Sequence, residues 1–100
     1  MEGKKFTVKV IFRKTGNMVY FSQLDIVRIL ERALRRTGLP LYFTKGFNPH
    51  VKMSFSGALK LGVEGDIEVT FYFTEEVSLG RLKKEIIPQL PAGLEIVNSE

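Results

Sequence analysis

Two segments of the chain alternate apolar and polar residues with a period of two. The first runs from Phe6 to Arg13 and the second from Ile67 to Phe73. Because successive side chains of a β-strand point to opposite faces, each segment predicts a strand with one buried face. The side chains expected to point inward are Phe6, Val8, Val10, Phe12, Ile67, Val69, Phe71 and Phe73. A sheet covered on one face is therefore the main constraint on the fold.

A helical pattern follows the first predicted strand. Ser22 offers an N-cap, and Asp25 stands three residues on, as in a capping box. Apolar residues then recur with the 3.6-residue period of a helix, and Gly38 is a typical residue for a helix end. We therefore expect a helix over residues 23–37.

The rest of the chain continues the same alternation of strands and helices. Short strands are predicted over residues 41–45, 51–55 and 94–97, and Ser78 caps a second helical pattern that Pro91 stops. The predicted fold class is α+β, with the split β-α-β order of ferredoxin-like domains. Two helices would cover one face of an antiparallel sheet and leave the other face open.

Composition indicates one soluble domain over residues 1–100. A chain of 100 residues with 44% hydrophobic side chains can bury a core, and the absence of cysteine excludes disulfides and thiol chemistry. No apolar run approaches the roughly 18 residues that a membrane helix needs, and the N-terminus lacks the apolar stretch of a signal peptide. We expect a cytoplasmic protein with no membrane contact.

The net charge of +4 is distributed unevenly along the chain. Residues 1–60 hold twelve lysines and arginines against three acids, whereas residues 61–100 hold three against eight. This asymmetry favours a basic surface that meets an anionic partner, with RNA the first candidate. The alternative is that folding intermixes the charges in space.

Part of the positive charge lies on the first predicted helix. Arg28, Arg32 and Arg36 recur every four residues on one stripe, and Glu31 is placed to pair with Arg35. Guanidinium groups recognise phosphate and carboxylate groups, so the stripe is a candidate binding surface. A solvated helix face explains the same pattern equally well.

A second candidate is the loop over residues 46–50, flanked by two lysines. Basic residues interleaved with aromatic rings are typical of surfaces that bind single-stranded nucleic acid. The alternative is a structural turn in which Phe47 fills the core and Asn48 or His50 bonds backbone groups, and the cis or trans state of Asn48-Pro49 is open. The candidate binding residues are therefore Arg28, Arg32, Arg35, Arg36, Lys45, Phe47, Asn48, His50 and Lys52.

Catalytic and metal-binding patterns are absent from the sequence. His50 is the one histidine, and the acids nearest to it in sequence, Glu31 and Glu64, are distant along the chain. We therefore expect no metal, no cofactor and no catalytic residue. A further hypothesis is a metal-independent ribonuclease that uses His50 as general acid or base, assisted by Tyr42 or Lys52.

An ordered series of short motifs spans nearly the whole chain. They include Lys14-Thr15-Gly16, Tyr20-Phe21-Ser22-Gln23-Leu24-Asp25, Glu31-Arg32-Ala33-Leu34-Arg35-Arg36, Gly46-Phe47-Asn48-Pro49-His50 and Leu61-Gly62-Val63-Glu64. In this series the chain resembles the radical-SAM-linked protein family, a bacterial domain of unknown function. The resemblance implies association with a radical-SAM protein and no catalytic assignment. Family domains run past this length, so the chain is either a short member or the first part of the pattern.

Two functions follow as expectations. The first is a non-catalytic accessory module that binds RNA, or another anionic partner, and presents it to a radical-SAM protein. The alternative is a protein-interaction domain whose basic helix docks on an acidic face of the radical-SAM enzyme without RNA.

Overall fold

The computed structural model describes residues 4–56 and 65–98. Its elements in chain order are β1 (Phe6–Lys14), the 3₁₀ helix η1 (Gly16–Tyr20), α1 (Gln23–Arg35), β2 (Met53–Ser56), β3 (Gly65–Phe73), α2 (Leu79–Ile86), the 3₁₀ helix η2 (Ile87–Gln89) and β4 (Leu94–Ile96).

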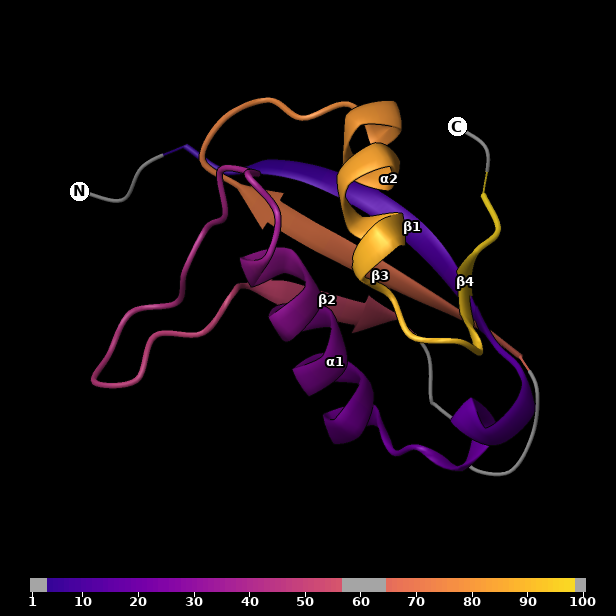
Figure 1. Cartoon of the computed structure of the whole chain (residues 1–100). Coiled ribbons are helices and arrows are strands. Elements are labelled where there is room, and N and C mark those ends of the chain that lie inside the picture. Colours follow the sequence, from indigo (N-terminus) through magenta and orange to yellow (C-terminus); the bar gives the residue numbers. More distant parts are fainter. Residues whose placement is uncertain (1–3, 57–64, 99–100) are drawn as a thin grey trace.

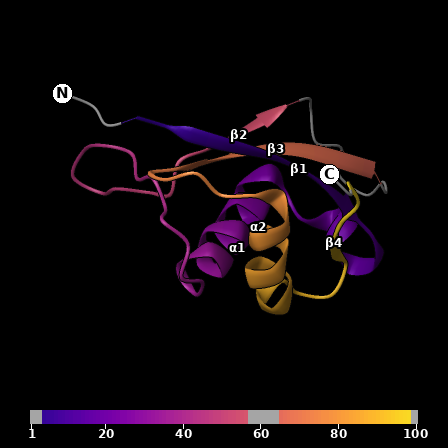
Figure 2. The ribbon, with the colours of Figure 1, turned by 90° about the horizontal axis from the view of Figure 1, so that it is seen from above.

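The four strands form one antiparallel sheet in the order β2-β3-β1-β4. Figure 1 shows α1 and α2 crossing the sheet, and Figure 2 shows that both helices lie on the same side of it. This is the strand order of a ferredoxin-like split β-α-β domain, so the predicted α+β class is confirmed. The opposite face of the sheet carries no helix among the described residues, and we call it the open face.

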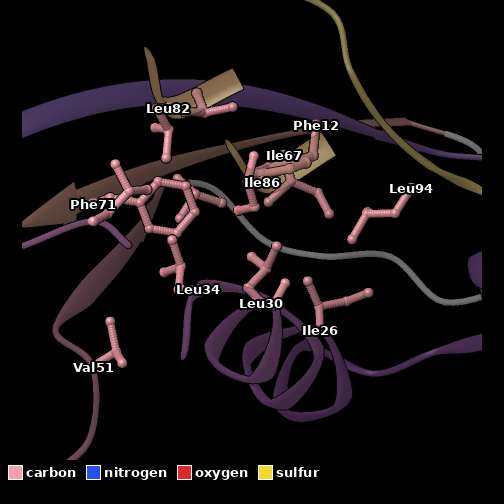
Figure 3. Packing of buried hydrophobic residues seen from close by; sticks show 14 of the residues in the cluster. Phe12, Ile26, Leu30, Leu34, Val51, Ile67, Phe71, Leu82, Ile86 and Leu94 are labelled. Carbon is pink, nitrogen blue, oxygen red and sulfur yellow. The ribbon is translucent and has the colours of Figure 1, made fainter. Parts of the chain in front are cut away.

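The core forms where the two alternating strands meet the helices. β1 and β3 pair along their full length, from Phe6 opposite Phe73 to Lys14 opposite Gly65, so their apolar sets share one face. The Phe12 and Phe71 rings meet edge to face with centroids 6.0 Å apart. Figure 3 shows side chains from both helices packed toward these strands, among them Leu30, Leu34, Leu82 and Ile86, all fully buried.

The start of α1 is set by a capping box. The Asp25 N–H donates to the Ser22 hydroxyl oxygen at 3.2 Å, and the Ser22 N–H donates to the Asp25 carboxylate at 3.0 Å. The end differs from the expectation, since the helix stops at Arg35 and not at Thr37. The Thr37 N–H and hydroxyl both turn back to the Leu34 carbonyl, which closes the last turn early.

Two other boundaries differ from the sequence-based expectation. Residues 41–45 form two isolated bridges and not a strand. Leu41 lies opposite Phe73 at the end of β3, whereas Phe43 lies opposite Val51 within a hairpin-like loop. The second helix becomes a 3₁₀ turn after Ile86, where Pro88 lacks the N–H that a continuing α-helix needs. The strands predicted over residues 51–55 and 94–97 appear one or two residues shifted, as β2 and β4.

Folding brings charges from the two halves of the chain together. On the open face the Arg13 Nε donates to the Asp66 carboxylate at 2.9 Å. The charge asymmetry along the sequence is therefore partly mixed in space. Within the described ranges no helix has the length and apolar character needed to cross a membrane.

Candidate nucleic-acid interface

The loop between α1 and β2 is a hairpin that extends beyond the sheet, as both ribbon views show (Figures 1 and 2). Its base is held by the Lys52 N–H, which donates to the Tyr42 carbonyl at 2.8 Å, and by the Tyr42 N–H, which donates to the Tyr72 carbonyl at 3.1 Å. Nearer the tip, the Thr44 N–H and the His50 carbonyl pair at 2.8 Å. The backbone of the loop is therefore hydrogen-bonded across the hairpin and, at its base, to the end of β3.

The tip of this loop is fully exposed. Gly46 has φ of +125°, a conformation that favours glycine, and Phe47 has no buried surface. The alternative in which Phe47 fills the core is therefore wrong. Lys45 and Asn48 are also exposed beside it, and no cis peptide bond occurs within the part of the chain that the structure describes.

Glu31 anchors the loop to α1. Its side chain is only 14% exposed, and its carboxylate lies 3.4 Å from Nδ1 of His50. The same carboxylate accepts a hydrogen bond from Arg35 at 2.8 Å and one from the Val51 N–H at 3.4 Å. His50 thus has a carboxylate partner, contrary to the expectation from sequence distance, because the hairpin folds back over the helix.

The charge state of Glu31 follows from these contacts. Burial raises the pKa of the Glu31 carboxyl, but hydrogen bonds from Arg35 and the Val51 N–H, with the charges of His50 and Arg35, outweigh burial. The net result is a pKa below the ordinary value of 4.5. Glu31 is therefore an anion near neutral pH, and it can fix the orientation of the His50 ring.

Arg35 makes the second link between helix and loop. Besides the ion pair with Glu31, its guanidinium donates to the Pro49 carbonyl at 3.4 Å and lies over the Phe43 ring, 5.1 Å from the centroid. The predicted pairing of Glu31 with Arg35 is confirmed. Arg35 therefore positions the loop.

The other helix arginines, although all exposed, do not share one surface. Arg28 lines a groove between α1 and β2, whereas Arg32 and Arg36 line a second groove between α1 and the segment after α2. The stripe drifts around the helix because four residues exceed one 3.6-residue turn. The helix therefore contacts the loop through Arg35, and of the stripe Arg28 shares a groove with loop residues.

Lysines and aromatic rings gather at the end of the open face nearest the loop. Tyr72 points to this face, since its neighbours Phe71 and Phe73 point into the core. The Lys52 ammonium lies 5.1 Å from the centroid of the Tyr72 ring, and the Lys5 ammonium lies 5.5 Å from that of Tyr42. We call Lys5, Tyr42, Lys45, Lys52 and Tyr72 the basic aromatic patch.

The patch surrounds a shallow hollow of about 210 Å³. The described residues that line this hollow are Lys5, Tyr42, Phe43, Thr44, Lys45 and Lys52, and none of them carries a carboxylate. At its border the Tyr72 hydroxyl and the Ser54 hydroxyl lie 3.0 Å apart within hydrogen-bonding distance. The surface can therefore offer positive charge, flat rings and hydroxyl groups to one ligand.

Sequence reasoning found Lys45, Phe47 and Lys52 but missed Lys5 and Tyr72. The strand period places Tyr72 on the outward face, so that signal was present in the sequence. The meeting of Lys5 with Tyr42 depends on the antiparallel pairing of β1 with β3 and on the course of the hairpin, and no local pattern encodes it. No group of acidic or histidine side chains able to hold a metal ion occurs within residues 4–56 and 65–98.

Fold and surface define a small α+β domain with ferredoxin-like strand order and polar surfaces suited to binding. The chain belongs to a family described as an uncharacterized protein conserved in bacteria (DUF2344), whose model matches residues 7–100. This agrees with the expected bacterial family of unknown function. No curated protein and no solved structure matches the chain.

Proposed function

We propose that this domain is an accessory module that binds single-stranded RNA on the open face, over the basic aromatic patch. The observation that carries the proposal is the pairing of Lys5 with Tyr42 and of Lys52 with Tyr72 beside a hollow whose described lining holds no carboxylate. Lysines attract the phosphate backbone, and the partly exposed rings of Tyr42 and Tyr72 can stack on bases of any sequence.

The loop extends this surface. Phe47 is fully exposed at the tip next to Lys45, so it offers a further ring at the border of the patch. A large apolar side chain exposed in this way has no role in packing the core, which favours a role in contacting a ligand. In this arrangement Arg35 and Glu31 hold the loop, and Phe47 and Lys45 make contact.

The proposed partner of the module is a radical-SAM protein, to which it would present the bound RNA in the cytoplasm. This part of the proposal is supported by the sequence resemblance alone. Arg28 and Arg32 lie on α1 and Arg36 caps its C-terminus, so these exposed arginines lie on the helical side of the sheet. They therefore leave a separate surface for such a partner while RNA occupies the open face.

The test is fluorescence anisotropy with a mixed-sequence single-stranded RNA. We expect binding at low salt and a slope of about −2 for log K against log salt, because the patch holds three lysines. The double variant Lys5→Glu/Lys45→Glu should weaken binding at least about tenfold. The matched control Arg32→Glu/Arg36→Glu carries the same charge change on the helical side and should bind within about threefold of the parent.

Absence of binding at low salt contradicts the RNA proposal and favours protein docking through α1. Equal losses in the two double variants would mean that phosphate contacts extend to the helix arginines, as the sequence alone suggested. Circular dichroism of each variant establishes that the fold is retained.

His50 supports a second candidate, metal-independent RNA cleavage. With Nδ1 beside Glu31, the atom left to accept a proton from an RNA 2′-hydroxyl is Nε2. The 2′ oxygen would then attack the adjacent phosphorus, and the 5′ oxygen would leave with a proton from Lys52 or Tyr42. RNA that stays intact with the protein in chelator, or equal cleavage by His50→Ala, rules this candidate out.

A further inference from the structure

A groove of about 540 Å³ runs between α1 and the edge strand β2. It lies on the helical side of the sheet. Thr44 and Lys52 line both this groove and the hollow of the basic aromatic patch, so they form the boundary between the two. The proposed RNA surface therefore does not account for the rest of this groove.

The floor of the groove is apolar. Leu24 on α1 is 57% exposed, and Val27, three residues further along the helix, is partly exposed. On the strand side, Met53 and Phe55 are also only partly buried. Most of these side chains are aliphatic, which suits apolar side chains of a protein better than nucleic-acid bases, since bases stack on aromatic rings.

The rim of the groove carries the guanidinium of Arg28 on the helix side. Lys52 also lines the groove, but its ammonium lies 5.1 Å from the centroid of the Tyr72 ring, on the open face. Glu31 is the one carboxylate in the lining, and Arg35, His50 and the Val51 N–H already engage it. The charge left to meet a ligand is therefore positive, and a carboxylate-bearing ligand complements it.

The strand beside the groove is a sheet edge. β2 pairs with β3 on one side, and no other described strand pairs with it at residues 53–56. The segment Met53-Ser54-Phe55-Ser56 contains no proline and no charged residue, the usual means of blocking an edge against further pairing. Among the described residues its outer backbone groups have no strand partner, and they can pair with a further strand.

We propose that this groove binds an extended, acidic segment of a partner protein, which adds to the sheet as a strand beside β2. Backbone hydrogen bonds to β2 would hold the segment. Its apolar side chains would pack on Leu24 and Phe55, while its carboxylates would face Arg28. This docking surface shares Thr44 and Lys52 with the hollow of the basic aromatic patch and is otherwise separate from the proposed RNA surface.

The test is a titration of the ¹⁵N-labelled protein with a short synthetic peptide in which glutamate alternates with valine. At peptide concentrations up to about 1 mM we expect saturable amide shifts in β2 and around Leu24. A peptide with lysine in place of glutamate should bind at least about tenfold more weakly. The glutamate peptide N-methylated at alternate amides should also lose binding, because it cannot form the strand hydrogen bonds.

Two arginines on the same helix provide a matched pair of variants. Arg28→Glu should weaken the glutamate peptide about tenfold, whereas Arg36→Glu, in the other groove, should leave its affinity within about twofold. No saturable shift in β2, or equal binding of the N-methylated peptide, overturns the proposal. Shifts in the groove produced by single-stranded RNA or by self-association, without peptide binding, overturn it as well.

Discussion

Glu31 shows how one side chain organises the candidate interface. Its carboxylate contacts Arg35, His50 and the Val51 N–H, so it joins α1 to the C-terminal end of the loop that carries Lys45 and Phe47. Because Glu31 is largely buried, these partners also stabilise its charge. The contacts that position the loop are therefore the same contacts that keep the Glu31 carboxylate ionised.

Glu31→Gln should lower the free energy of unfolding by about 1 kcal/mol at pH 7, because the amide keeps only part of these interactions. The pKa of Glu31 is lowered in the folded state, so its contribution is complete above pH 4.5 and is lost as pH falls through the lower folded pKa. Urea unfolding between pH 3 and 7 should show the variant and parent converging at the acid end. Glu75→Gln, at an exposed position, is the control and should match the parent throughout.

Phe47→Ala should separate binding from stability. Because the ring is fully exposed, we expect a change of less than about 0.5 kcal/mol in the free energy of unfolding. Loss of one stacking contact should weaken RNA binding about fivefold or more, measured by anisotropy. Ile87→Ala removes another exposed apolar side chain, on η2, and an equal loss there would contradict a specific role for Phe47.

At the scale of elements, the junction of η1 with β4 depends on a close backbone approach. Gly93 has φ of +93°, its carbonyl accepts from the Thr15 N–H at 2.8 Å, and a Cβ atom would lie 2.7 Å from the Thr15 carbonyl oxygen. Gly16 has φ of +58° but open space around it. At both positions glycine permits a backbone with positive φ. At Gly93 the missing side chain also avoids a clash with the Thr15 carbonyl oxygen.

Gly93→Ala should therefore cost at least about 2 kcal/mol of unfolding free energy, since strain and a backbone clash combine. Gly16→Ala should cost about 1 kcal/mol, from the left-handed conformation alone. Thermal and urea unfolding of the two variants measure the difference. Equal costs would show that the clash at Gly93 is relieved by a small backbone shift.

Elements with a local signal could be predicted from the sequence, and those without one could not. The period of two located β1 and β3, and the Ser22–Asp25 capping box located the start of α1. Residues 41–45 look like a strand, but their bonding depends on where β3 ends, which is a tertiary property. The contact of His50 with Glu31 has the same origin, because only the folded hairpin brings them together.

At the scale of the whole molecule, the sheet separates two surfaces. Both helices lie on one side of the sheet (Figure 2). The open face carries the basic aromatic patch, and the helical side carries the exposed arginines and the groove beside β2. The sequence predicted a basic first half, and folding divides that charge between the two sides. A module that binds RNA on one side and a protein on the other is consistent with this division.

The most direct measurement is a map of amide chemical shifts on adding single-stranded RNA to the ¹⁵N-labelled protein at low salt. We expect the largest shifts on Lys5, Thr7, Tyr42, Lys45 and Tyr72, and little change around Arg32 and Arg36. Shifts concentrated on α1 with an unchanged open face would contradict RNA binding by the open face.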